Sequence, residues 1–148
     1  MHLIDVRDVY KIYNPGENQV NALDGVSLTI DEGEFVAIIG QSGSGKSTLM
    51  NMLGLLDVPT SGEYYINGNL VEDLTDDQMS VIRNEQIGFI FQDYKLLNNK
   101  TVWENVAFAL EVIGTRRSTI KSLVPKVLNT VGLTGKEKNY PHELSGGE

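Results

Sequence analysis

Apolar and polar residues alternate along much of the first thirty residues, which is the pattern of half-buried strands. The alternation covers residues 2–10 and 20–30, and Asn14-Pro15-Gly16 between them consists of residue types that favour a turn. We therefore expect a hairpin here. Residues 62–66 predict another strand, which enters a tight turn at Asn67-Gly68 because this pair tolerates positive φ.

Two short, continuous apolar runs at residues 34–39 and 87–91 differ from this alternating pattern. Such runs are typical of strands buried on both faces, which need helices packed on their sheet. Between them, the apolar residues of segment 46–56 fall at helical spacing, and Pro59 follows. The order of strand, glycine-rich loop and helix favours an α/β core.

The second half of the chain is predicted to be mainly helical, after a short helix at residues 76–83. Residues 102–113 repeat apolar positions on one helical face, and Gly114 ends the pattern. A further helix is expected at 123–131, where Pro125 is tolerable in the first turn if Ser122 caps the helix. A helix that began earlier would be kinked at Pro125.

Length and composition narrow the possible functions. The chain has 148 residues, of which 41% are hydrophobic, which suffices for one domain with one core. Its net charge of −8 disfavours a nucleic-acid partner, and the lack of cysteine excludes a disulfide framework. No apolar stretch is long enough to span a membrane. We therefore expect a cytoplasmic protein that reaches a membrane only through a partner.

The most specific motif is a phosphate-binding loop at residues 40–47. Gly40-Gln41-Ser42-Gly43-Ser44-Gly45-Lys46-Ser47 fits the pattern G-x-x-x-x-G-K-[ST] and lies between a predicted strand and a predicted helix. Glycines allow backbone N–H groups to turn toward phosphate oxygens, Lys46 suits the β- and γ-phosphates, and the Ser47 hydroxyl suits Mg²⁺. Thr48 is placed to support the α-phosphate. The motif predicts binding of a nucleoside triphosphate.

Three motifs in a fixed order carry a resemblance to a known family. The phosphate loop is followed by Gln92 in Phe91-Gln92-Asp93 and then by Leu144-Ser145-Gly146-Gly147-Glu148, and in this the whole chain resembles the ABC-transporter ATPases. The resemblance implies an α/β fold: a P-loop NTPase core with an antiparallel β subdomain and part of a helical subdomain. Residues 1–148 would be one incomplete ATP-binding domain, with the core at about 1–92 and the helical subdomain with the signature motif at about 93–148.

The resemblance also implies roles for residues outside the loop. Tyr13 would stack on adenine, and the alternative is a strand-end tyrosine that packs on the core. Gln92 would reach Mg²⁺ or the attacking water, and the alternative is an ordinary polar residue at a strand end. Ser145, Gly146 and Gly147 would contact the γ-phosphate held by a second ATP-binding subunit in a head-to-tail dimer, and the alternative is a flexible Ser-Gly-Gly segment.

The resemblance to subfamilies is mixed. Residues 33–92 resemble the ATPases of macrolide export and lipoprotein release, whereas residues 93–114 and the final glutamate resemble the cell-division ATPase FtsE. Both groups imply an integral membrane permease-type partner at the inner face of the cell membrane. The loop 93–100 and the helix 102–113 are a candidate docking surface for that partner, and equally a candidate part of the helical core.

The implied activity is ATP hydrolysis coupled to movement of the membrane partner, with ATP and Mg²⁺ as cofactors and with Lys46 and Gln92 in the catalytic site. An FtsE-like regulator of cell-wall hydrolases and a nucleotide-binding module without turnover are the alternatives. The family's catalytic glutamate and switch histidine match no residue here, since His2 and His142 are wrongly placed. We therefore expect the 148-residue chain to bind ATP without efficient hydrolysis.

Overall fold

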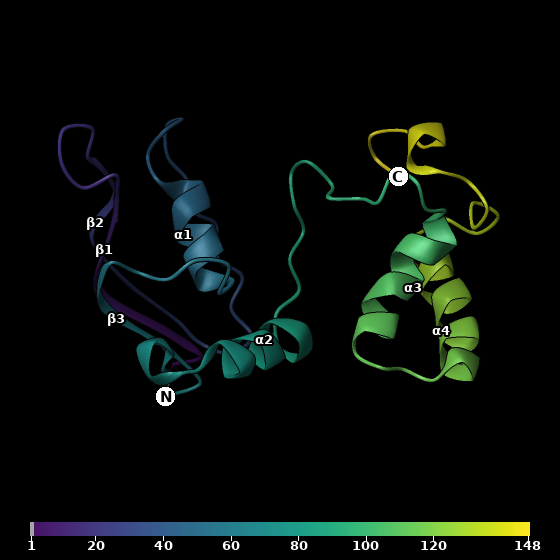
Figure 1. Cartoon of the computed structure of the whole chain (residues 1–148), viewed down its shortest axis with the longest axis horizontal. Helices are drawn as coiled ribbons and strands as arrows, with labels where there is room; N and C mark the ends of the chain where they lie inside the picture. The colour runs from purple at the N-terminus through teal and green to yellow at the C-terminus, as the bar shows by residue number, and fades with distance from the viewer. Residues whose placement is uncertain (1) are drawn as a thin grey trace. The chain divides into compact units, whose positions relative to one another are not determined.

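The computed structural model describes residues 2–148 and divides the chain into two compact units, Met1–Phe89 and Ile90–Glu148. The first unit contains a sheet with two helices, and the second is helical (Figure 1). The mixed α/β fold expected from the sequence is confirmed. Each unit has its own buried core.

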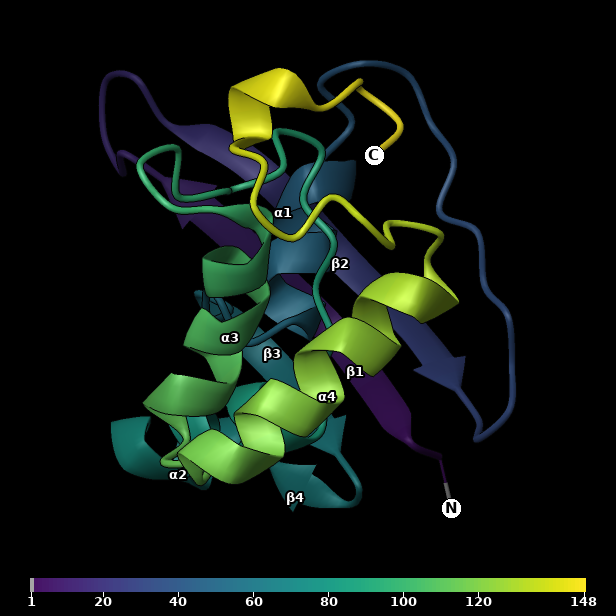
Figure 2. The same ribbon diagram turned by 90° about the vertical axis from the view of Figure 1, so that its right-hand side faces the viewer.

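The first unit is built on a four-stranded antiparallel sheet with strand order β2-β1-β3-β4. Its strands are β1 (Ile4–Tyr13), β2 (Val20–Ile30), β3 (Ser61–Ile66) and β4 (Asn69–Leu70). The predicted hairpin is the pair β1–β2, whose register runs from Ile4 opposite Ile30 to Tyr13 opposite Val20. Strands β1 and β2 cross Figure 2 diagonally as neighbours. The Asn67-Gly68 turn between β3 and β4 has positive φ at both residues, as predicted.

Helix α1 (Lys46–Leu53) packs its apolar side against this sheet (Figure 1). Leu49 and Met52 of the helix are buried together with Val6 and Val9 of β1. Tyr64 of β3 is fully buried in the same core, and its hydroxyl donates a 2.9 Å hydrogen bond to the Leu53 carbonyl at the end of α1. This bond ties the phosphate-loop helix to the central part of the sheet.

Replacing Tyr64 with phenylalanine is expected to destabilise the fold by about 1–2 kcal/mol, because the Leu53 carbonyl would lose its side-chain donor in the core. Burial raises the pKa of Tyr64, so its contribution is fully present below the unfolded tyrosine pKa of about 10 and is lost as the pH rises further. Urea unfolding at pH 7 measures the effect. Tyr65→Phe is the matched control, because the Tyr65 hydroxyl bonds only the exposed Glu63. Equal losses in the two variants would contradict the explanation.

The two continuous apolar runs are not strands, so this part of the prediction is wrong. Residues 34–39 and 87–91 carry no strand assignment, and Phe35 and Ile90 are 99% and 97% exposed. A strand needs a neighbour to accept and donate its backbone hydrogen bonds, and in residues 2–148 none pairs with these runs. Individual side chains of the runs, Ile38 and Ile87 among them, pack against the core of the first unit.

Two helices begin at capping boxes that the sequence pattern already contains. Thr75 starts α2 (Asp76–Glu85) and exchanges hydrogen bonds with Gln78, and Thr101 starts α3 (Val102–Val112) and does the same with Glu104. Each box satisfies two N–H groups that the first turn leaves without a partner. A one-turn 3₁₀ helix, η1 (Val71–Asp73), precedes α2, and another, η2 (Pro141–Glu143), lies near the signature motif.

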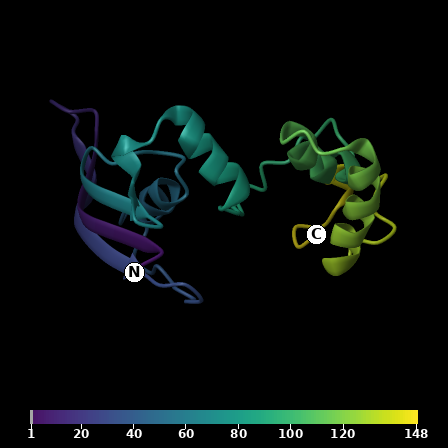
Figure 3. The same cartoon turned by 90° about the horizontal axis from the view of Figure 1, so that it is seen from below.

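The second unit is organised around α3 and α4 (Arg117–Thr130), which lie side by side in both Figure 1 and Figure 3. Val102 of α3 and Val124 of α4 are buried in their shared core, and Val106 and Leu110 pack against it. The apolar stripe of α3 is therefore largely core, while Ile113 at its end is exposed. This favours the core interpretation of that stripe over the docking interpretation.

Helix α4 begins earlier than predicted. Its N-cap is Arg116 rather than Ser122, so Ser122 and Pro125 both lie inside the helix. Ile120, Val124 and Leu128 recur at intervals of four residues and are all buried, and this continuous apolar face outweighs the hydrogen bond that Pro125 cannot donate.

Candidate functional site

The phosphate loop leads directly into the N-terminus of α1. Gly43 and Gly45 have φ of 80° and 88°, a left-handed conformation that residues with a Cβ rarely adopt. Gly45 is the N-cap and offers no capping side chain, and the first turn of α1 contains no acidic residue. The first N–H groups of a helix lack intrahelical acceptors and carry the positive end of its dipole. This end of α1 is therefore suited to bind an anion.

Lys46 adds a full positive charge at the same place. Its Nζ donates hydrogen bonds to the backbone carbonyls of Gly40 and Gln41 at 2.7 and 2.5 Å, and to the Ser44 hydroxyl at 3.3 Å. The side chain thus bends back across its own loop. Phosphate oxygens placed in the loop would compete with these neutral acceptors and gain from the charge of the ammonium group.

A cavity of about 620 Å³ joins the loop to the end of the β1–β2 hairpin. Its volume lies within the ordinary range for ligand sites, about 300–1,000 Å³. Among the described residues that line it, Lys46 alone carries a charge. The lining residues are Tyr13, Val20, Asn21, Ala22, Ser42, Gly43, Gly45, Lys46, Ser47 and Thr48. The cavity therefore combines a basic, amide-rich end with an aromatic ring.

Tyr13 is 37% exposed at this cavity, and its hydroxyl does not point freely into solvent. It donates a 2.8 Å hydrogen bond to Oδ2 of Asp57, and this bond, together with partial burial, raises the pKa of Tyr13. The Nζ of Lys11 lies 5.2 Å from the centroid of the ring. No local pattern indicated Asp57 as a site residue, because its partners on β1 are more than forty positions away in the chain.

Gln92 and the signature residues lie in the second unit. Ser145 donates to Oε2 of Glu148 from both its backbone N–H and its hydroxyl, each at 2.8 Å. These bonds and the nearby Lys136 lower the pKa of Glu148 to about 2. The Glu148 N–H in turn donates to the Ser145 carbonyl at 3.0 Å, which closes a turn over Ser-Gly-Gly-Glu. The motif is ordered by its own side chains.

The loop after Gln92 contacts the signature motif within the second unit. The Tyr94 hydroxyl donates a 2.9 Å hydrogen bond to the carbonyl of Gly146, and Asp93 forms an ion pair with Lys95. Tyr94 has a positive φ of 60°, which turns the chain sharply just after Gln92. Gln92 itself has no resolved interaction that identifies a role, and its assignment to metal or water stays a prediction.

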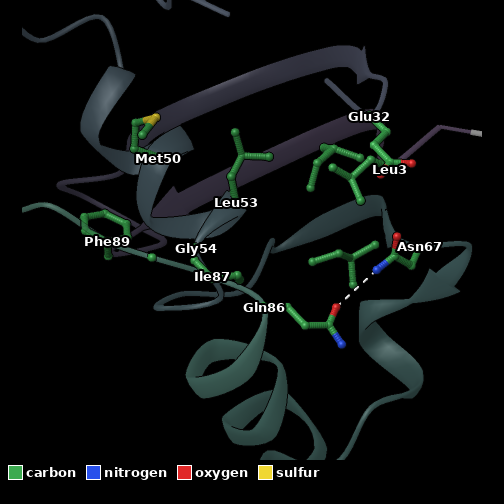
Figure 4. A pocket seen from close by; sticks show the side chains of 12 residues that line it. Leu3, Glu32, Met50, Leu53, Gly54, Asn67, Gln86, Ile87 and Phe89 are labelled. Atoms are coloured by element: carbon green, nitrogen blue, oxygen red, sulfur yellow. Dashed lines mark hydrogen bonds between the residues drawn. The ribbon is translucent and has the colours of Figure 1, made fainter. Parts of the chain in front are cut away.

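A larger cavity of about 720 Å³ in the first unit has different chemistry (Figure 4). Met50, Leu53 and Gly54 line one side and Ile87 and Phe89 another, and the drawn hydrogen bond joins Asn67 to Gln86. Among the described residues that line it, Glu32 alone carries a charge. An apolar hollow with a carboxylate does not suit a phosphate, so the candidate nucleotide site is the loop cavity.

No group of three or more His, Cys, Asp or Glu side chains in residues 2–148 is arranged to hold a metal ion. Over the same residues, no helix combines the length and the apolar character needed to cross a bilayer.

A glycine-rich loop with a lysine at a helix N-terminus is the defining motif of P-loop nucleotide-binding domains. Comparison with known proteins specifies the family: the sequence profile of the ABC transporter family matches residues 23–148, and the chain belongs to this family.

Two curated relatives share one description, a macrolide export ATP-binding/permease protein. The macrolide export ATP-binding/permease protein MacB of Mannheimia succiniciproducens is 48% identical over 148 residues, and the alignment covers 100% of this chain and 23% of that protein. MacB of Hyphomonas neptunium is 48% identical over 146 residues, with 99% and 23% covered. The chain thus spans about a quarter of the length of these relatives. Both alignments include the residues after Gln92, and they give no support to the FtsE-like alternative.

Solved structures agree with this assignment. The dimeric structure of MJ0796, a bacterial ABC transporter cassette, shares 39% sequence identity and a TM-score of 0.87, and covers 97% of this chain and 63% of its own. A second structure of MJ0796, in a post-hydrolysis state bound to ADP and Pi, matches equally well.

Proposed function

We propose that this chain binds ATP with Mg²⁺ in the loop cavity, as the ATP-binding part of an exporter of the macrolide-export type. The observation that carries the proposal is the cavity itself, which has Tyr13 at one end and the loop with Lys46 at the other. A purine stacks favourably on an aromatic face, and a triphosphate suits a helix N-terminus with a lysine. The MJ0796 cassette bound to ADP and Pi supports the same class of ligand.

Within this proposal, different loop residues bind different phosphates of ATP. Lys46 binds the β- and γ-phosphates, Thr48 supports the α-phosphate, and the backbone amides of residues 40–47 surround the phosphate chain. Ser47 fits Mg²⁺, because this ion is usually bound through substrate phosphates and only one or two protein oxygens. The bound ion neutralises phosphate charge, while the protein residues hold the triphosphate in place.

The remaining assignments concern the whole protein. Gln92 would sense the metal or the attacking water, and Ser145, Gly146 and Gly147 would contact the γ-phosphate on a second ATP-binding subunit. The relatives named ATP-binding/permease proteins support a membrane permease as partner, and the dimeric MJ0796 cassette supports the paired subunits. The domain would then lie peripherally on the inner face of the membrane, and ATP hydrolysis would drive the permease.

The 148-residue chain is expected to bind ATP without measurable turnover. Hydrolysis needs a group that orients the attacking water, and the cavity has no carboxylate among the described residues that line it. A fluorescent ATP analogue measures binding, and phosphate release in the presence of Mg²⁺ measures turnover. Lys46→Ala supplies the background for both assays. Phosphate release clearly above that background would mean that residues within 1–148 complete the catalytic site.

A further inference from the structure

Asp57 lies four residues beyond α1 and accepts three hydrogen bonds. Lys11 Nζ donates to Oδ1 at 2.6 Å, the Tyr13 hydroxyl donates to Oδ2 at 2.8 Å, and the Val58 N–H donates to Oδ1 at 2.8 Å. Two of these donors come from β1, and the acceptor belongs to the segment that follows the phosphate-loop helix. The carboxylate therefore connects the aromatic end of the cavity to the element that forms its phosphate end.

Backbone contacts reinforce this connection. Lys11 Nζ also donates to the Val58 carbonyl at 2.8 Å, so one ammonium group bonds two successive residues of the segment. Further along, the Ile12 N–H donates to the Thr60 hydroxyl at 2.9 Å, and the Thr60 N–H donates to the Tyr10 carbonyl at 2.8 Å. Residues 57–60 are thus bonded to the last four residues of β1, including both donors to Asp57.

The ion pair is partly shielded from water, which distinguishes it from the exposed pairs of this chain. The Lys11 and Asp57 side chains are 13% and 28% exposed. Partial burial acts to raise the pKa of Asp57, but the hydrogen bonds from Lys11 and Tyr13 outweigh it and hold this pKa below its usual value. Asp57 is therefore ionised, and accepts from Tyr13, throughout the neutral pH range.

The geometry of the ring follows from these contacts. The hydroxyl fixes one edge of Tyr13, and Lys11 Nζ lies over the ring 5.2 Å from its centroid, close enough for a cation–π interaction. A tyrosine that could rotate freely would lose conformational entropy on binding a base, and a fixed ring has already lost it.

We propose that Asp57, with Lys11, is a positioning residue that fixes the ring of Tyr13 for stacking on the purine base, and so sets the affinity for the base independently of the phosphates. This rests on the proposed function, in which Tyr13 binds adenine. Asp57 is not among the described residues that line the cavity, so its proposed effect on the ligand passes through Tyr13. Its contribution is confined to ligands that carry a base.

The test compares ATP with inorganic tripolyphosphate, which has the phosphates but no base. Both are titrated with Mg²⁺ into the 148-residue chain by calorimetry, with competition titrations for the weaker ligand. Asp57→Asn keeps the shape of the side chain and removes its charge, and is expected to weaken ATP binding about 3- to 10-fold while leaving tripolyphosphate affinity unchanged. Tyr13→Phe is expected to act similarly, and the double variant no more than the stronger single one.

Asp24→Asn is the matched control, because Asp24 is an exposed carboxylate on β2 outside the cavity, and it should change neither affinity. Equal weakening of both ligands by Asp57→Asn would overturn the proposal in favour of general support of the fold, and so would an unchanged affinity for ATP. Tyr13→Ala distinguishes a failure of the positioning role of Asp57 from a failure of the adenine assignment of Tyr13. If it weakens ATP binding while Asp57→Asn does not, only the positioning role fails. If it has no effect although Lys46→Ala does, the adenine assignment fails and the positioning role with it.

Discussion

Replacing Lys46 with alanine is expected to reduce the affinity of the chain for ATP by about 100-fold or more. Hydrogen bonds from a charged donor to phosphate are among the strongest in proteins, and removing the lysine that donates them costs roughly 2–4 kcal/mol. Lys46 is the only charge among the described residues lining the cavity, so no neighbour can replace it. Calorimetric titration with ATP and Mg²⁺ measures the loss.

The same substitution should leave the fold intact. The contacts of Lys46 Nζ are with atoms of its own loop, and Leu49 and Met52 on the buried side of α1 are untouched. A thermal melt within a few degrees of the parent chain would therefore accompany the loss of binding. Lys121→Ala on the exposed side of α4 removes the same charge far along the sequence and should change neither quantity. ATP affinity within about threefold of the parent would show that the loop does not bind the triphosphate.

Features encoded by neighbouring residues were predictable from the sequence. The alternation within β1 and within β2, the turn at Asn67-Gly68 and helix α1 each depend on residues only a few positions apart, and each forms where expected. The early start of α4 was missed for the opposite reason. Pro125 is a strong local signal against the interior of a helix, and the buried face formed with α3 overrides it.

The two apolar runs show where local reasoning fails. Hydrophobicity predicts that a segment gains from burial, but strand formation depends on which other segment supplies its hydrogen bonds. Ile38 and Ile87 find places in the core, whereas Phe35 and Ile90 remain exposed. The sequence pattern indicates which segments gain from burial, but it does not indicate which segment will supply their backbone hydrogen bonds.

The candidate site also combines residues that are neighbours in the sequence with residues that only the fold brings together. The phosphate loop is contiguous in sequence, so its residue types could be recognised at once. Tyr13 reaches the same cavity through the β1–β2 hairpin, and its role in binding adenine stays a prediction. The pairing of Lys11 with Asp57 joins positions 46 apart, and no spacing rule predicts it.

Substituting alanine for Gly45 is expected to destabilise the first unit by about 2–4 kcal/mol and to remove ATP binding in the folded fraction. Gly45 has φ of 88°, which strains any residue with a Cβ by roughly 1–2 kcal/mol. An added Cβ would also overlap the carbonyl oxygen of Ala22 on β2, with Leu23 Cδ2 at 3.4 Å. The overlapping atom belongs to the backbone of a paired strand and cannot rotate away, so the loop or the sheet must shift.

Gly33→Ala is the control that separates the steric overlap with Ala22 from the backbone strain of a positive φ. Gly33 lies in the same unit with φ of 83°, and an added Cβ there meets no atom within 4 Å. That variant should lose only about 1 kcal/mol by urea unfolding and should bind ATP normally. The difference between the two variants measures how closely the phosphate loop is packed against β2. If Gly45→Ala is no less stable than Gly33→Ala, the loop can move away from β2 at little cost, and its position over the cavity is not fixed by the sheet.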